Sequence, residues 1–296
     1  ALAMAVEKAK ETDAELVMAS DPDADRVGAA VKNNEGEWVL LNGNQTALMF
    51  VYYLITRWKE LGKINGKEYI VKTIVTTETI KTIAERNGVE MYDVYTGFKW
   101  IANVMRENEG KKNYIGGGEE SYGFLCEDFV RDKDAVSACV ILAEIAAWAK
   151  DQGLSLYQLL QKIYVEYGFS KEKGISVVKK GKSGAEEIEA MMKKFRENPL
   201  TEIAGSKVTY FYDYSTLKGK DYAENETVTL DMPTTSNVLQ YFTEDNTKVS
   251  IRPSGTEPKI KFYCEVHSKV KNIDELPEAE KAAEEKINQI KASLGI

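Results

Sequence analysis

Three aspartates, Asp21, Asp23 and Asp25, stand at every second position of the stretch DPDADR, and Arg26 follows directly. Alternate residues of an extended or tightly turned segment point the same way, so three carboxylates at this spacing can converge on one hard cation. The spacing also opens the calcium loop of an EF-hand, but Arg26 and Lys32 occupy the positions where that loop needs glycine and glutamate. The stretch therefore predicts an open oxygen-ligand site suited to Mg2+, with a solvated acidic turn between two strands as the alternative.

A second stretch, RPSGTEPK at residues 252–259, combines a Ser-Gly-Thr turn with Arg252 and Lys259. Consecutive backbone N–H groups, two hydroxyls and two cations form a phosphate nest. Each charge-assisted hydrogen bond contributes roughly 1.5–3 kcal/mol, so three or four suffice to hold a phosphate on a net-acidic chain. The spacing of a Walker A loop is absent. A polar hairpin turn is the alternative interpretation.

Two further loops carry side chains of chemical interest. The GGGEESYG loop places Glu119 and Ser121 beside three glycines, which suits recognition of neighbouring sugar hydroxyls, although such turns also occur without a function. In the YTGFK loop, Lys99 is a candidate proton shuttle or phosphate contact, with an exposed lysine at a helix start as the alternative. Arg131 and Lys133 add positive charge to the same region or are simply solvated.

The apolar pattern predicts the elements that position these loops. It indicates a helix at 1–12, a strand at 15–20 that ends at the acidic stretch, and a hairpin of strands 26–33 and 37–41. Helices and strands then alternate: helix 44–61, strand 67–75, helix 78–87, strand 89–95, helix 98–107 and two long helices at 134–150 and 155–168. In such α/β sheets, ligand-binding residues come from loops at strand carboxyl ends, as 95–99 and 115–123 do.

The pattern changes near Gly168. A strand at 175–180, a helix opened by the capping-box pair Ser183 and Glu186, four strands in hairpin order and a final helix at 275–294 predict an α+β unit on an antiparallel sheet. The predicted fold is therefore a partial mixed α/β domain at 1–41, a complete α/β domain at 42–168 and an α+β domain at 169–296.

Composition excludes several classes of protein. The net charge of −8 over 296 residues argues against a nucleic-acid surface, and the single histidine, His267, makes a histidine triad or a His-rich zinc site hard to build. The apolar run at 138–148 contains Glu144 and is too short and too polar to span a bilayer, and no secretory leader opens the chain. Three widely spaced cysteines suggest neither a disulfide framework nor a zinc cluster. A cytoplasmic location fits best.

Five motifs occur in one order along the chain: DPDADR, TGFKW, GEESYG, RDKDA and RPSGTEPKIKFY. In this respect the sequence resembles the α-D-phosphohexomutase family, and within it the phosphoglucomutases that carry a GEES sugar loop. The resemblance covers essentially the whole chain. It implies an enzyme with four domains around one cleft, in which a phosphoserine on the first domain exchanges phosphoryl groups with a sugar phosphate through a bisphosphate intermediate. It also implies Mg2+ as cofactor and glucose 1,6-bisphosphate as activator.

The resemblance assigns a role to each motif residue. It implies Asp21, Asp23 and Asp25 as metal ligands, Arg26 as a contact to the phosphoserine region, Lys99 in acid–base or phosphate-binding duty, Glu119 and Ser121 as ligands of sugar hydroxyls, and Arg252, Ser254, Gly255 and Thr256 as ligands of the phosphate that is not transferred. Phosphoryl transfer depends on positioning and charge neutralisation more than on a reactive side chain, which agrees with this set.

One family motif is missing. The serine loop, of the type TASHNP, precedes the metal loop in the family, and nothing before Asp21 resembles it. We therefore expect the chain to correspond to the end of domain 2 and to domains 3 and 4, to need the N-terminal domains of the same polypeptide as its partner, and to lack turnover alone.

The substrate is predicted from one position in the sugar loop. Gly123 stands where related mutases carry a histidine, which favours glucose 1-phosphate and glucose 6-phosphate over phosphopentose, phosphomannose and phosphoglucosamine. Two alternatives stay open: a non-catalytic sugar-phosphate-binding protein, and an acidic Mg2+-binding structural protein.

Overall fold

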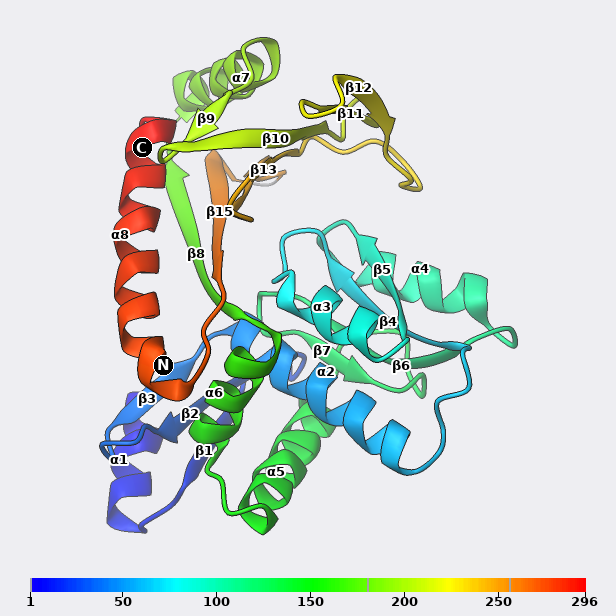
Figure 1. Ribbon diagram of the computed structural model, residues 1–296, viewed down its shortest axis with the longest axis vertical. Helices are drawn as coiled ribbons and strands as arrows, with labels where there is room; N and C mark the ends of the chain where they lie inside the picture. Colours follow the sequence, from blue (N-terminus) through cyan, green and yellow to red (C-terminus); the bar gives the residue numbers. More distant parts are fainter. Residues whose placement is uncertain (1, 180, 256) are drawn as a thin grey trace. The chain divides into compact units, whose positions relative to one another are not determined.

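The computed structural model describes residues 2–179, 181–255 and 257–296, with the backbone alone at residue 182. Contacts divide the chain into two compact units, Ala1–Tyr167 and Gly168–Ile296, each with its own sheets and helices (Figure 1). The described residues confirm the predicted mixture of α/β and antiparallel α+β architecture. The further division of the first unit at residues 41 and 42 stays a prediction.

The first unit begins with a small antiparallel sheet of strands β1 (Leu16–Ser20), β2 (Val27–Lys32) and β3 (Trp38–Leu41). Helix α1 (Ala3–Glu11) packs on it through a core of Ala9, Val17 and Ala30. Ser20 pairs with Val27, so the acidic stretch DPDADR forms the turn of the β1–β2 hairpin.

The second sheet of this unit has the strand order β5-β4-β6-β7. Its strands are β4 (Glu68–Thr73), β5 (Glu90–Val94), β6 (Asn113–Gly118) and β7 (Phe124–Cys126). Helices α3 (Thr79–Arg86) and α4 (Phe98–Asn108) connect the parallel strands β4, β5 and β6 in the predicted alternation. A core that includes Tyr69, Phe98 and Ile101 fills the space between α4 and the sheet.

Three helices complete the first unit: α2 (Gly43–Glu60), α5 (Ala135–Asp151) and α6 (Leu156–Tyr167). Asn42 and Gln45 form a capping box at the start of α2, and the Asp134 carboxylate caps α5, accepting the Ser137 N–H at 2.8 Å. Helix α2 packs against β6 and is buried along its first thirteen residues except Gln45.

The glycine-rich segment differs from the prediction. The sequence suggested a loop from 115 to 123, whereas Gly116, Gly117 and Gly118 lie in strand β6, which pairs with the unpredicted strand β7. The physical reason is close packing: a Cβ on Gly117 would lie 2.4 Å from the carbonyl oxygen of Val71. The glycines therefore serve the approach of neighbouring backbones here, not a turn.

The second unit is an antiparallel sheet in the order β12-β11-β10-β13-β14-β15-β8, with β9 paired to β10. The strands are β8 (Phe169–Val178), β9 (Glu202–Ile203), β10 (Ser206–Asp213), β11 (Lys218–Asp221), β12 (Glu226–Thr229), β13 (Leu239–Thr243), β14 (Lys248–Pro253) and β15 (Lys259–Ser268). Helices α7 (Gly181–Glu197) and α8 (Leu276–Leu294) pack on β14, β15 and β8. Strand β8 starts six residues before the prediction, β9, β11 and β12 were not predicted, and Ser183 lies inside α7 and does not cap it.

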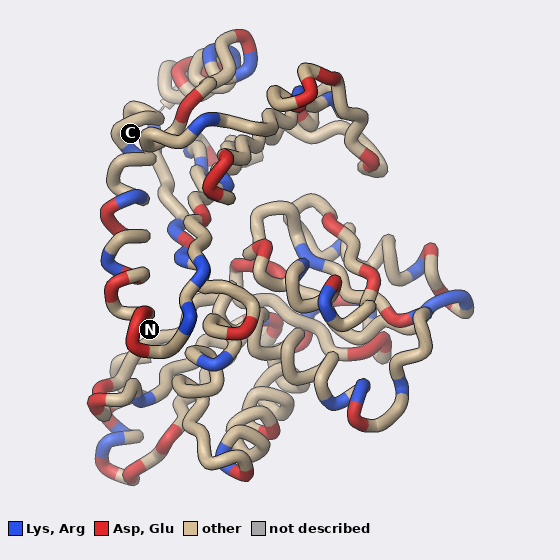
Figure 2. The backbone as a smooth tube through the Cα atoms, in the orientation of Figure 1, with Lys and Arg blue, Asp and Glu red and all other residues tan. Residues whose placement is uncertain are grey.

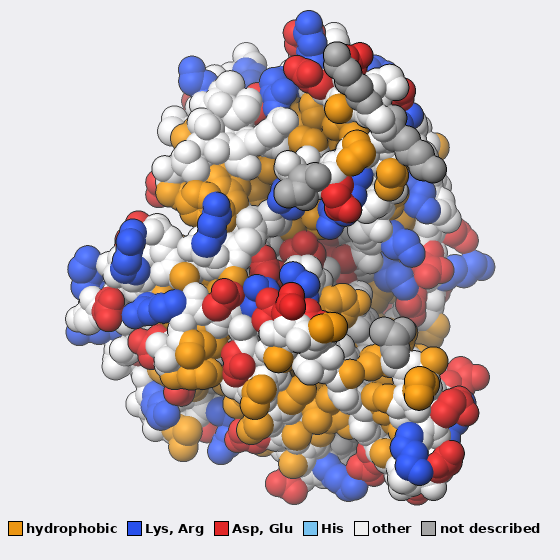
Figure 3. Space-filling view, turned by 180° about the vertical axis from the view of Figure 1, so that it is seen from behind, with side chains coloured by type: hydrophobic (Ala, Val, Ile, Leu, Met, Phe, Trp, Pro, Cys, Tyr) orange, Lys and Arg blue, Asp and Glu red, His pale blue; other side chains and the backbone are white. Residues whose placement is uncertain are grey.

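Acidic and basic side chains are interspersed on the surface. Acidic and basic residues are mixed along α8 (Figure 2), and their side chains are mixed over the face drawn in Figure 3, in keeping with 47 acidic and 39 basic residues. Within the described ranges, no helix combines the length and apolar character needed to cross a membrane.

Candidate functional site

The acidic stretch is a closed turn. Asp21 Oδ1 accepts the backbone N–H groups of Asp25 and Arg26 at 3.1 and 3.2 Å, and Ala24 takes a left-handed backbone with φ 55°. Burial alone would raise the pKa of Asp21, but these N–H groups outweigh it and lower the pKa. The side chain of Asp23 is exposed. The turn therefore holds Asp21 as a carboxylate.

Backbone hydrogen bonds join this turn to two distant segments. Arg26 forms an isolated β-bridge with Gly123, and the N–H of Val27 donates to the carbonyl of Tyr122 at 3.2 Å. The N–H of Ala135, at the start of α5, donates to the carbonyl of Ala24 at 3.1 Å. The DPDADR turn, the GEES loop and the RDKDA segment therefore lie together, although more than 90 residues separate the first from the others.

The GEES loop is also fixed to the TGFK loop. Glu119 is only 6% exposed, and its Oε1 accepts the N–H of Gly97 at 2.8 Å, where φ is 111°. A residue with a side chain rarely adopts that backbone conformation, so glycine is required there. Lys99 on the first turn of α4 is exposed, with its Nζ 5.0 Å from the centre of the Trp100 ring, and Ser121 is half-buried.

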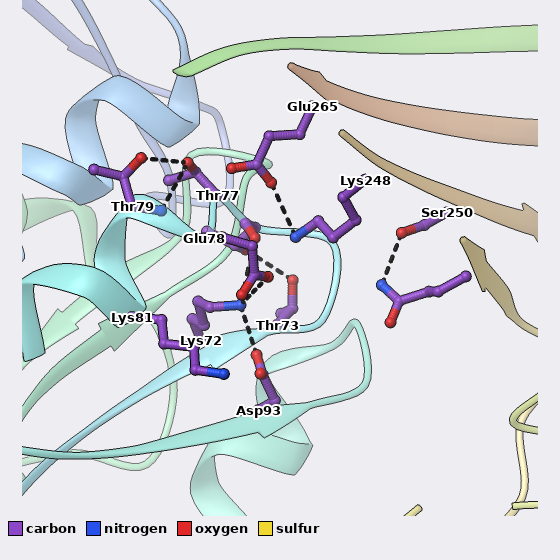
Figure 4. Close-up of polar contacts among 12 residues, drawn as sticks. Lys72, Thr73, Thr77, Glu78, Thr79, Lys81, Asp93, Lys248, Ser250 and Glu265 are labelled. Carbon is purple, nitrogen blue, oxygen red and sulfur yellow. Dashed lines mark hydrogen bonds and ion pairs between the residues drawn. The ribbon is translucent and has the colours of Figure 1, made fainter. Parts of the chain in front are cut away.

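Threonines at the end of β4 and just after it hold the other side of the GEES loop, a contact that the sequence did not predict. The N–H of Glu120 donates to Thr76 Oγ1 at 3.1 Å, and the Thr73 hydroxyl donates to Glu120 Oε2 at 3.2 Å. The fully buried Lys72 secures this segment through ion pairs with Glu78 at 2.9 Å and Asp93 at 2.6 Å (Figure 4). A lysine inside a buried strand is a signal that the sequence contained, because such a charge needs partners.

Lys133 is a cation in direct contact with the acidic turn. Its Nζ lies 2.8 Å from Asp25 Oδ2 and 3.3 Å from Asp132 Oδ1. Burial would lower the pKa of Lys133, but these carboxylates outweigh it and raise the pKa. The other oxygen of Asp25, Oδ1, is buried and has no hydrogen-bond partner in the structure.

The acidic turn is suited to a metal by its chemistry more than by its present arrangement. Among the described residues, no three His, Cys, Asp or Glu side chains form a group that could hold a metal ion as they stand. The donor set is nevertheless all oxygen, which hard divalent cations prefer, and the buried oxygen of Asp25 lacks a partner that a cation would supply. These residues therefore fit Mg2+.

The second unit contains a basic pocket of about 200 Å3 at the end of the β14–β15 hairpin. Its lining residues are Arg252, Pro253, Ser254, Glu257, Lys259 and Lys261. Arg252 and Lys261 are opposite each other on the two strands. An ion pair with Lys259 lowers the pKa of Glu257. Gly255 is exposed, and Thr256 lies outside the described residues. The pocket is suited to an anion, and Lys261 is a member that sequence reasoning missed.

Polar side chains continue from this pocket along one face of the sheet. Ser250 lies two residues before Arg252 on β14, and its Oγ accepts from Gln240 Nε2 at 2.8 Å. Lys248, two residues further back, forms a buried ion pair with Glu265 at 3.0 Å (Figure 4). The opposite face carries Val249 and Ile251, which are buried in the core.

Two family models match the chain. One describes the α/β/α domain III of phosphoglucomutase/phosphomannomutase and matches residues 42–167, and the other describes the C-terminal domain and matches residues 177–283. The chain belongs to the α-D-phosphohexomutase family. Of the predicted site residues, those of the TGFK, GEES and RPSGTEPK motifs lie within the matched segments, and the three aspartates precede them.

Phosphohexomutases are also found among the relatives and solved structures most similar to the chain. It is 38% identical over 272 residues to a phosphoglucomutase of Staphylococcus aureus, covering 92% of this chain and 48% of that protein. The chain thus spans about half the length of this curated relative. In fold it is similar to a phosphoglucomutase/phosphomannomutase family protein of Burkholderia thailandensis, with a TM-score of 0.61 at 18% identity, covering 99% of this chain and 50% of the other. It is similar also to Paramecium parafusin in its open form, with a TM-score of 0.60 at 17% identity, covering 98% and 49%.

Proposed function

We propose that this chain is part of a phosphoglucomutase, which interconverts glucose 1-phosphate and glucose 6-phosphate through glucose 1,6-bisphosphate. One observation carries the proposal: backbone hydrogen bonds hold the all-oxygen DPDADR turn against the GEES loop. A cation-binding turn beside a loop suited to sugar hydroxyls is what phosphoryl transfer to a sugar requires. The phosphoglucomutase relative supports the same reaction.

In the proposed reaction, a phosphoserine elsewhere in the complete polypeptide gives its phosphoryl group to the free hydroxyl of a sugar monophosphate. The new O–P bond forms as the serine O–P bond breaks, and the proton of that hydroxyl passes to the serine oxygen. The resulting bisphosphate turns around and returns its other phosphoryl group to the serine. Asp21, Asp23 and Asp25 would hold Mg2+, which supplies neutralisation of phosphoryl charge when bound. Arg26, exposed next to this turn, would contact the phosphoserine region.

The remaining residues would bind the substrate. Glu119 and Ser121 would accept and donate hydrogen bonds to sugar hydroxyls, while exposed Lys99 would contact phosphate or exchange a proton. The phosphate that is not transferred would be held by Arg252, Ser254, Gly255 and Thr256, together with Lys261. The basic pocket supports this role because it combines three cations with one carboxylate that is already paired. We also propose a cytoplasmic location. The free cysteines among the described residues agree with a reducing compartment.

An assay with a panel of substrates tests the proposal. The protein made from the whole natural reading frame is incubated with glucose 1-phosphate, Mg2+ and a trace of glucose 1,6-bisphosphate. A coupled dehydrogenase detects the glucose 6-phosphate that forms. Ribose, mannose and glucosamine 1-phosphates are compared, with direct detection of each 6-phosphate (5-phosphate for ribose). We expect the highest turnover with glucose 1-phosphate. Preference for another sugar would reassign the substrate within the family, and absence of turnover with all four would favour a sugar-phosphate-binding protein.

A further inference from the structure

The two carboxylate oxygens of Asp25 have different surroundings. Oδ2 lies 2.8 Å from the Nζ of Lys133, whereas Oδ1 is buried and has no hydrogen-bond partner in the structure. A buried carboxylate oxygen without a partner is unfavourable unless a cation or donor occupies the space it faces. The ion pair thus fixes one oxygen of Asp25 and leaves the other for a ligand.

The path of Lys133 to Asp25 depends on a glycine. A Cβ on Gly123 would lie 2.6 Å from Cδ of Lys133 and 3.2 Å from Glu119 Oε2, and Gly123 has no positive φ that would by itself require glycine. The lysine side chain is 13% exposed, and its Nζ lies 5.9 Å from the centre of the Phe98 ring. The missing side chain at Gly123 therefore gives the lysine stem room to pass.

The segment that carries Lys133 is fixed at its end. Asp134 donates its N–H to the carbonyl of Phe124 at 3.1 Å, and Ala135 donates to Ala24 at 3.1 Å. The backbone next to Lys133 is thereby held against the start of β7 and the acidic turn at once. Because the backbone next to it is fixed, Lys133 can hold Asp25 in one orientation.

We infer that Lys133 is a positioning residue for the metal site: by pairing with Asp25 Oδ2 it turns Oδ1 toward the cation, and Gly123 is needed because Lys133 passes over it. This inference rests on the Mg2+ site of the proposed function. Partners that orient a ligating carboxylate typically change metal affinity 10- to 100-fold when removed. Simple charge repulsion predicts the opposite sign, because removal of a nearby cation strengthens the binding of Mg2+. The sign of the effect therefore decides between the two.

The test is calorimetric titration of the 296-residue chain with Mg2+ alone. We expect Lys133→Ala to weaken binding about 10- to 100-fold and Lys133→Met, which keeps the hydrocarbon stem, to weaken it similarly. Lys150→Ala removes an exposed lysine paired with Glu15 and should leave the affinity unchanged. Tryptophan fluorescence checks that each variant is folded.

A double-mutant cycle tests the role of Gly123. Gly123→Ala should weaken Mg2+ binding in the wild type and have a much smaller effect in the Lys133→Ala background, where the lysine stem that it displaces is gone and the 3.2 Å approach to Glu119 Oε2 remains. Equal or tighter binding by both Lys133 variants, with the wild type binding Mg2+ saturably, would overturn the inference and leave the metal site standing. If the wild type shows no saturable Mg2+ binding, both the role of Lys133 and the metal site itself are wrong.

Discussion

The two candidate sites are built in different ways. In the first unit, backbone hydrogen bonds collect the DPDADR turn, the GEES loop and the start of α5, and a side chain ties in the TGFK loop. In the second unit, one turn and the two strands beside it supply the whole basic pocket. The first site is therefore sensitive to packing throughout its unit, whereas the second depends on a few side chains. Substitutions in each unit test this contrast.

The largest effect is expected at the basic pocket. Arg252→Ala removes charge-assisted hydrogen bonds to phosphate, each contributing roughly 1.5–3 kcal/mol, so the affinity for glucose 6-phosphate should fall roughly 10- to 100-fold. Calorimetric titration measures this change, and Lys207→Ala, an exposed lysine of the same unit, is the charge-matched control. Because the pocket is local, unfolding of the first unit should not change. An unaltered affinity would show that the phosphate binds elsewhere.

A packing change should instead destabilise the first unit. Gly117→Ala places a Cβ 2.4 Å from the backbone carbonyl oxygen of Val71, and such overpacking costs about 1–3 kcal/mol. Gly28→Ala is the matched control, since its Cβ would make ordinary contacts at 3.7 Å or more. All four tryptophans lie in the first unit, so fluorescence during urea unfolding reports on that unit. Equal stability of both variants would contradict the close approach of β6 and β4.

A smaller and pH-dependent effect is expected at Glu68. Its Oε2 accepts the N–H groups of Asn65, Gly66 and Lys67, and Asn113 donates to Oε1. Burial alone would raise the pKa of Glu68, but these donors outweigh it and lower the pKa below its usual 4.5. Glu68→Gln should therefore cost about 1.5 kcal/mol near pH 7.

The sign of the pH dependence follows from the lowered pKa. The stabilisation by Glu68 is complete above the pKa of the unfolded chain and is lost as pH falls through the lower pKa of the folded chain. The difference in unfolding free energy between wild type and Glu68→Gln should thus be constant from pH 7 to 5 and shrink below about pH 4.5. Tryptophan-monitored unfolding at several pH values measures it. A difference that grows on acidification would mean that the donors do not stabilise the charged form.

Patterns of residue type predicted the elements well where side chains decide the local structure. Asp134 caps α5, Gly88 and Gly110 follow α3 and α4 with positive φ, and the hairpin turns at Gly36. The glycine run of β6 was misjudged because glycine marks both turns and close contacts between strands, and β7 is too short to show an alternating pattern.

The arrangement of the site was less accessible from sequence. The bonds from Val27 to Tyr122 and from Ala135 to Ala24 use backbone N–H and C=O groups. Every residue except proline carries both groups, so residue types do not reveal these bonds. Lys261 shows the complementary case: it faces Arg252 only because of the β14–β15 register, which was not known beforehand. The motifs predicted which residues are chemically suited to the site, and the fold determined which of them meet.

Turnover of glucose 1-phosphate is the decisive test of the proposed function. The coupled assay, with Mg2+ and glucose 1,6-bisphosphate, is run on the 296-residue chain and on the protein from the whole natural reading frame. We expect turnover by the latter and none by the chain alone, because the proposed phosphoryl donor is not among these residues. Full turnover by the chain alone would contradict it, since the phosphoryl donor would then have to lie within the two units described here.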